Sequence, residues 1–265
     1  IDNDKIVHQA SLGYADAAQT IPLTAQHIFQ IGSIAKEFNA TGIMLLKEQG
    51  KLELDQKVSE FFPDLPPWSK KITIKHLLQY TSGLPDVNWY TIKSEADNWK
   101  DLYRLTALKF EPGTNYYYNN NNTFLQRKII EKITGMKFND FVQEKLLKPI
   151  GIHNAIVDPL GHEPFMTQSF NENFKTDTLI LHITGWTCLN ITDFYKWSQA
   201  VTNFKNISPS STLEIITPAY PGKQAGLGKG AMRNYKIETH IHDGTGISSQ
   251  ALLVNEVKKK ERFFF

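Results

Sequence analysis

A single cysteine, Cys188, is the only thiol among the 265 residues of this chain. One cysteine cannot form an internal disulfide, so a disulfide-stapled scaffold is excluded and the fold must rest on an apolar core. Redox chemistry is not indicated either. The cysteine count leaves the compartment open, because many exported proteins of bacterial type also lack disulfides.

The chain also lacks an excess of charge of one sign and a long apolar run. Its 29 Lys and Arg stand against 27 Asp and Glu, so electrostatics predict no nucleic-acid partner and no membrane-surface partner. No apolar stretch approaches the length of a membrane span, and no secretion signal opens the chain. The Lys258–Lys260 run is expected to be a solvated turn. A hydrophobic content of 41% is ample for one large domain or two intimate subdomains.

Hydrophobic spacing predicts strands at both ends of the chain and helices between them. Helical periodicity begins at Ser33 and stops at Gly50, and further helices are predicted over 124–134, 138–147 and 191–201. Strands are predicted over 5–14, 248–254 and 262–265, and over a segment in which Tyr235, Ile237, Thr239 and Ile241 form the half-buried face.

This order of elements predicts an α/β chain of the α+β kind, because strands at the two ends can meet in one antiparallel sheet with the helical part inserted. We expect a single domain over 1–265. Its sheet subdomain would take in about 1–32 and 180–265, and its mostly helical subdomain about 33–179.

The first candidate for chemistry is the Ser33-Ile34-Ala35-Lys36 segment, the only Ser-x-x-Lys in the chain. One helical turn places both side chains on one face, so that a lysine amine can take the proton that makes the serine hydroxyl a nucleophile. The positive end of the helix favours the developing anion. A helix-capping serine followed by a solvent-facing lysine is the alternative interpretation.

Two further segments could complete such a site. A Pro112-Gly113 turn leads into a Tyr-x-Asn in either of two registers, Tyr117 with Asn119 or Tyr118 with Asn120. A rigid loop of this kind can present a phenol and an amide to a cleft, although a polar surface loop has the same composition. The third segment is His242-Asp243-Gly244-Thr245, where a glycine leaves room for substrate at a strand edge. Its alternative is a plain turn.

Taken together, these segments resemble the class C β-lactamase, DD-peptidase and family VIII-type esterase group. The resemblance rests on Ser33-x-x-Lys36, Tyr118-x-Asn120 and His242-x-Gly244 in that order, and on the intervening segments Gly50–Asp55, Thr81–Asp86 and Phe110–Thr114. It covers nearly the whole chain, and its spacing after Pro112 selects Tyr118 over Tyr117. It implies a β-lactamase/transpeptidase-like fold.

The resemblance also implies a role for each site residue. Ser33 attacks an amide or ester carbonyl, Lys36 and Tyr118 share the proton handling, and Asn120 orients Lys36 and the substrate. His242 stands where many β-lactamases have lysine. The backbone amides of Ser33 and Thr245, beside Gly244, are the implied oxyanion hole. No cofactor and no metal are implied. The expected partner is a small-molecule or peptide substrate, and the expected location is outside the cytoplasm.

Two features depart from the family pattern. Tyr80 replaces the histidine that commonly precedes Thr-Ser-Gly, a change expected to alter packing beside the site. The terminal helices of the fold are not found, which we interpret as a chain trimmed at both ends.

The walls of the cleft are expected around Trp89-Tyr90, 116–122 and Gly185-Trp186. A compact esterase-like or peptidase-like enzyme is favoured over a β-lactamase. The competing hypotheses are a non-catalytic member that binds peptide or peptidoglycan, and a metal-dependent hydrolase that uses His240 and His242.

Overall fold

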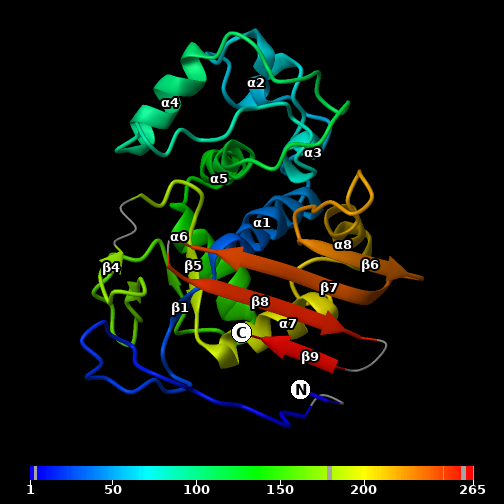
Figure 1. The fold of residues 1–265 in the computed structure, drawn as a ribbon. Helices are drawn as coiled ribbons and strands as arrows, with labels where there is room; N and C mark the ends of the chain where they lie inside the picture. The colour runs from blue at the N-terminus through cyan, green and yellow to red at the C-terminus, as the bar shows by residue number, and fades with distance from the viewer. Residues whose placement is uncertain (3–4, 178–180, 247, 258–260, 265) are drawn as a thin grey trace.

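An antiparallel sheet in the order β6–β7–β8–β9 forms the C-terminal part of the chain (Figure 1). The computed structural model describes residues 1–2, 5–177, 181–246, 248–257 and 261–264. The sheet consists of β6 (Lys229–Arg233), β7 (Lys236–Thr245), β8 (Gln250–Glu256) and β9 (Glu261–Phe264). Two small sheets pair β1 (Phe29–Gln30) and β2 (Ile156–Val157) with β5 (Thr187–Leu189), and β3 (Ser169–Phe170) with β4 (Thr176–Asp177).

Helices fill the segment between the first short strand and the main sheet. They are η1 (Gly32–Ala35), α1 (Lys36–Glu48), α2 (Val58–Phe61), η2 (Pro67–Lys70), α3 (Ile74–Leu78), α4 (Glu95–Arg104), α5 (Asn120–Thr134), α6 (Phe138–Phe141), η3 (Val142–Leu147), η4 (Lys148–Ile150), α7 (Ile191–Thr202) and α8 (Pro209–Ile216). α2, α3 and α4 lie together at one end of the molecule, away from the main sheet (Figure 1). The mixed helix and antiparallel-sheet architecture predicted from the sequence is confirmed.

Helix α1 lies between the main sheet and α5 (Figure 1). Its first nine residues, 36–44, are all buried, as expected of a helix enclosed by the rest of the fold. One apolar core runs through α1, α5 and the sheet, and Phe38, Phe124 and Leu253 belong to it. Gly50 has a φ of +67° and follows the end of the helix, in agreement with the predicted stop. Because α1 is buried, its first turn, which begins at Lys36, is held in place by the surrounding core.

The face that β7 buries differs from the prediction. Ala231 pairs with Thr239 and Met232 with Ile237, so Glu238 is an extra residue in β7. A bulge of one residue reverses which side chains face the core beyond it. As a result His240, His242 and Gly244 are buried, whereas the sequence pattern had placed Thr239 and Ile241 on that face.

The strand predicted over residues 5–14 is wrong. These residues are exposed and have only isolated bridges, at Lys5 and Tyr14. Strand-favouring side chains make a strand only where a sheet surface receives them, and Ile6 and Val7 are 58% and 66% exposed. The edge next to β9 is instead met by residues 1–2, where Ile1 and Arg262 exchange backbone hydrogen bonds. The Lys258–Lys260 turn and the end of the last predicted strand at Phe265 lie outside the described residues.

Candidate active site

The turn that carries Ser33 packs directly against the end of β7. Gly32, with a φ of +54°, allows this approach, because a Cβ on it would lie 2.6 Å from the backbone nitrogen of Thr245. A Cβ on Gly244 would lie 2.0 Å from the carbonyl oxygen of Ile31. The two glycines therefore bring the backbone of the Ser33 turn close to that of Thr245, and the resemblance implies an oxyanion hole at these two residues.

Lys36 stands one turn after Ser33 and reaches back to it. The Lys36 Nζ donates a hydrogen bond of 2.9 Å to the Ser33 Oγ. Lys36 is only 8% exposed, and its Nζ lies 5.2 Å from the centre of the Tyr118 ring. The candidate nucleophile and the candidate base are thus in hydrogen-bond contact beside a phenol, an arrangement that would allow proton transfer from the serine.

Tyr118 comes from the loop that leads into α5. The Asn119 side chain caps this helix by accepting a hydrogen bond from the Asn122 backbone, and so fixes the residue before it. Tyr118 lines the cleft at Ser33, whereas the Tyr117 ring lies under the Lys109 ammonium at 4.5 Å. The Tyr118 hydroxyl is buried without a hydrogen-bond partner in the described part of the chain, so no described protein group occupies it.

Tyr80 supports this loop from behind. Its ring is buried and lies 4.7 Å from the Tyr118 ring, and its carbonyl accepts a hydrogen bond from the Tyr117 backbone. Burial and the neighbouring Tyr118 raise the pKa of Tyr80 well above its usual range, so it stays neutral. The residue that departs from the family pattern is thus a packing partner of Tyr118, in line with the expectation that the departure alters packing beside the site.

Asn120 does not contact Lys36. Its backbone and side-chain nitrogens donate to the Asp86 Oδ1 at 2.7 and 3.1 Å, and no hydrogen bond between Asn120 and Lys36 exists among the described residues. Because the amide is already engaged by a carboxylate, the structure does not have it orienting Lys36. Asp86 is the residue that holds Asn120, and its place in the Thr81–Asp86 segment was the only sequence signal for it.

His240 and His242 share one buried carboxylate. The Glu37 Oε1 lies 2.8 Å from the His240 Nε2 and 2.8 Å from the His242 Nδ1, and the Trp197 Nε1 donates to the Glu37 Oε2 at 2.7 Å. Burial raises the pKa of Glu37, but the two histidines outweigh it and hold that pKa well below its usual range. The carboxylate is therefore charged in the interior, directly beneath the site.

A cleft of about 400 Å³ opens above Ser33. It is lined by Ser33, Tyr116, Tyr118, Gly222, Lys223, Gln224, Lys229, Asp243 and Thr245. The expected aromatic wall is present at Tyr116 and Tyr118. The other expected aromatics do not line it: Tyr90 is fully exposed elsewhere, and neither Trp89 nor Trp186 borders it. Charged groups of both signs, two lysines and one aspartate, take their place at the rim.

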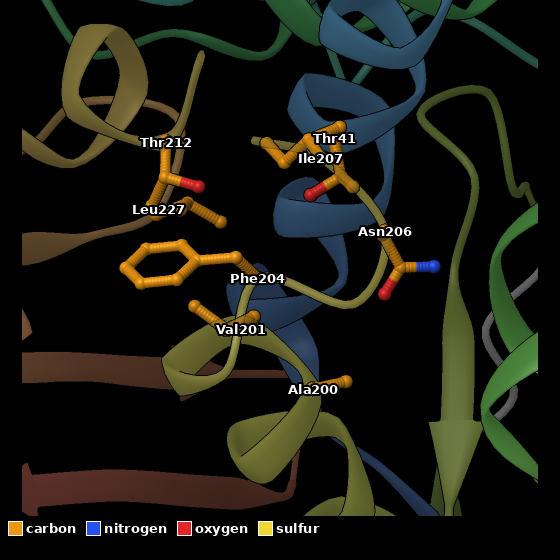
Figure 2. A pocket seen from close by; sticks show the side chains of 8 residues that line it. All are labelled: Thr41, Ala200, Val201, Phe204, Asn206, Ile207, Thr212 and Leu227. Carbon is orange, nitrogen blue, oxygen red and sulfur yellow. The ribbon is translucent and has the colours of Figure 1, made fainter. Parts of the chain in front are cut away.

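A second hollow lies between α1, α7 and α8 (Figure 2). It is lined by Thr41, Ala200, Val201, Phe204, Asn206, Ile207, Thr212 and Leu227. Its volume is about 10 Å³, room for about one water molecule. The Thr41 Oγ1 and the Asn206 Oδ1 are buried there without a partner among the described residues. This hollow is too small for a substrate, and the cleft at Ser33 is the candidate active site.

The metal hypothesis for His240 and His242 finds no third ligand in the described residues. No group of three or more His, Cys, Asp or Glu side chains there is placed to hold a metal ion. Glu37 is close to both histidines, but its 2.8 Å contacts have hydrogen-bond geometry.

The chain has the β-lactamase/transpeptidase fold. An antiparallel sheet is flanked by helices, and the turn that carries Ser-x-x-Lys borders a cleft. The chain belongs to the Beta-lactamase family, whose model matches residues 1–166. The resemblance predicted from the motifs is confirmed. No helix in the described part of the chain has the length and apolar character needed to cross a membrane.

The chain is similar to several curated proteins and solved structures. It is 35% identical to penicillin-binding protein 4* of Bacillus subtilis over 57% of this chain and 35% of that protein. It is 30% identical to the putative penicillin-binding protein PbpX of the same organism, over 82% of this chain and 57% of that protein. It is 27% identical to a teichoic acid D-alanine hydrolase of Staphylococcus aureus, over 83% of this chain and 58% of that protein. A penicillin binding protein structure from Bacillus halodurans superimposes with a TM-score of 0.84 at 23% identity, covering 100% of this chain and 89% of that one.

The chain thus spans about one third to just under three fifths of the length of these curated relatives.

Proposed function

We propose that this protein is a serine hydrolase that forms an acyl-enzyme at Ser33 from an amide or ester carbonyl. The observation that carries the proposal is the 2.9 Å hydrogen bond between the Lys36 Nζ and the Ser33 Oγ at the base of the cleft. Membership of the Beta-lactamase family supports it.

The chemistry follows from the groups at the cleft. In the reactive form Lys36 is a neutral amine and takes the proton of the Ser33 hydroxyl as its oxygen attacks the carbonyl carbon. The oxyanion then accepts hydrogen bonds from the backbone amides of Ser33 and Thr245. The tetrahedral intermediate collapses when the leaving amine or alcohol gains a proton through Tyr118. Water then hydrolyses the acyl-enzyme and restores Ser33.

A substrate in which D-alanine or a similar D-amino acid forms the scissile bond is the substrate class we infer. The relatives' names support this, because one is a teichoic acid D-alanine hydrolase and others are penicillin-binding proteins. The rim supports it too, since Asp243 can pair with a substrate ammonium and Lys223 and Lys229 can pair with carboxylate or phosphate groups. Such substrates belong to the cell envelope, so we propose that the protein works outside the cytoplasm.

Intact-protein mass spectrometry tests the proposal. The protein is incubated with benzylpenicillin and, separately, with an activated ester of D-alanine, and the same is done with Ser33→Ala and with Ser11→Ala, a change at an exposed serine. An adduct or turnover in the wild type and in Ser11→Ala, with a loss on the order of 10³-fold or more in Ser33→Ala, is the expected result. Equal behaviour of Ser33→Ala and wild type would rule out the acyl-enzyme and favour a binding protein. Turnover abolished by a chelator and restored by zinc would instead favour the metal-dependent hypothesis.

A further inference from the structure

Glu37 is a buried carboxylate that the mechanism above does not use. It is fully buried, and so are His240 and His242, at 0% and 1% exposure. A buried charge costs free energy unless donors surround it, and Glu37 has three donors, the two histidines and Trp197. The cluster connects α1, at the residue after Lys36, to β7, where His242 lies two residues before Gly244. It therefore lies directly behind both halves of the proposed site.

The hydrogen bonds fix the proton positions on both histidines. An ionised carboxylate only accepts hydrogen bonds, so the nitrogens that face the Glu37 Oε1 carry hydrogen: Nε2 on His240 and Nδ1 on His242. In a neutral histidine the other ring nitrogen then has no hydrogen. The His240 Nδ1 and the His242 Nε2 are both buried without a partner among the described residues. His242 thus presents a bare Nε2 in the interior beside the site.

We propose that Glu37 is a positioning residue that holds His242 in the Nδ1–H tautomer and fixes the orientation of its ring, two residues before the Gly244 that packs against the Ser33 turn. The inference rests on the proposed function and deepens it, since it gives His242 a defined protonation state.

Lys36 and Glu37 are neighbours in the sequence, yet one contacts Ser33 and the other contacts the histidines of β7. Successive residues of a helix point about 100° apart, so Lys36 reaches Ser33 while Glu37 points to the buried face of β7. Gly228 packs against the other side of His242, because a Cβ on it would lie 2.7 Å from the His242 ring. The ring is held between this backbone and the carboxylate, and its orientation is fixed before any substrate binds.

The tautomers can be measured without any activity. Ser33→Ala protein labelled with ¹⁵N-histidine is recorded by long-range ¹H–¹⁵N correlation at pH 7 to 8, with assignment from His240→Gln and His242→Gln. We expect hydrogen on Nδ1 of His242 and on Nε2 of His240. Hydrogen on Nε2 of neutral His242 would overturn the proposal. Because the nucleophile is absent, this result does not depend on whether the protein is a hydrolase.

The catalytic consequence is measured with Glu37→Gln and Glu37→Asp. Without the carboxylate neither the tautomer nor the ring orientation of His242 is fixed, so we expect kcat/KM to fall about 10- to 100-fold. Glu37→Asp keeps a carboxylate that can accept from His242 and should recover part of this loss.

Glu214→Gln is the matched control, because it removes a carboxylate that pairs with Lys47 of the same helix away from the cleft. We expect it to leave kcat/KM unchanged. A folded Glu37→Gln protein with wild-type kcat/KM would refute the positioning role while leaving the Ser33 hydrolase intact. If Glu37→Gln does not fold, the tautomer measurement on Ser33→Ala decides alone.

Discussion

The two walls of the Ser33 cleft are held by different kinds of contact. The wall made by the Ser33 turn and β7 rests on backbone against backbone at Gly32 and Gly244. The opposite wall, the loop with Tyr118, rests on side chains, namely the Tyr80 ring and the Asp86 carboxylate. Close-packed backbone has no room to shift, whereas a side-chain contact can be removed by one substitution without moving the backbone. We therefore expect changes in the first wall to reduce stability and activity together, and changes in the second wall to act mainly on activity.

Gly244→Ala is the strongest test of this difference. The added Cβ would overlap the Ile31 carbonyl at 2.0 Å, so either β7 or the Ser33 turn must move. We expect a loss of about 3 kcal/mol in the free energy of unfolding, together with nearly all activity. Urea titration and ester turnover measure the two effects.

Gly222→Ala is the control for this substitution. Gly222 also borders the cleft and has a positive φ, but nothing lies within 4 Å of its missing Cβ. Only the cost of a left-handed conformation, about 1 kcal/mol, is then expected. Equal losses at both glycines would show that the β7 wall is no more rigid than the cleft rim.

Asp86→Ala tests the other wall. Asp86 accepts hydrogen bonds from both nitrogens of Asn120. Asp86 is half-buried, so water can replace part of what the carboxylate accepts, and the net loss of stability is on the order of 1–2 kcal/mol. Because these bonds hold the start of α5, we expect kcat/KM to fall at least about tenfold with a smaller loss of stability than in Gly244→Ala. Asp64→Ala, at an exposed carboxylate, should change neither. A collapse of stability equal to that of Gly244→Ala would remove the distinction between the walls.

Local sequence patterns predicted the Ser33–Lys36 pair better than they predicted the helix and strand that surround it. Ser33 lies in η1 and Lys36 is the first residue of α1, so the two are one helical turn apart and local helical geometry alone brings them together. The start of α5 was predicted at Phe124 because apolar spacing begins there, while the helix begins at Asn120 because Asn119 caps it. The buried face of β7 was predicted wrongly, since a bulge at Glu238 leaves no mark in residue alternation.

Glu37 could have been suspected from the sequence. It lies three residues after Ile34 and four before Thr41, which puts a carboxylate in the stripe that the helix buries. Its partners could not have been predicted, because His240 and His242 are more than 200 residues away and only the fold joins them. Tyr80 and Asp86 are similar cases, since their roles depend on where a distant loop packs.

The acid stability of the protein provides a third prediction. The histidines hold the pKa of Glu37 below its value in the unfolded chain, about 4.3. A depressed folded pKa contributes stability that is fully present above the unfolded pKa and is lost as pH falls through the folded value. We therefore expect the unfolding free energy to fall below about pH 4 by on the order of 1 kcal/mol more in wild type than in Glu37→Gln. Urea titrations between pH 3 and 7 measure this. If the unfolding free energies of wild type and Glu37→Gln changed with pH in parallel, the pKa of Glu37 would be the same in the folded and unfolded protein.

The two phenols of the cleft allow the finest distinction between the walls. Tyr116 and Tyr118 both border the cleft, but burial raises the pKa of Tyr116 to about 12. Tyr116 therefore stays protonated near neutrality, and we expect it to form a surface of the cleft rather than to carry a proton. Tyr116→Phe should change kcat/KM less than about threefold, whereas Tyr118→Phe should cost on the order of 10²-fold or more. Comparable losses in the two variants would contradict the assignment of proton transfer to Tyr118, because both substitutions remove only a hydroxyl from the same loop.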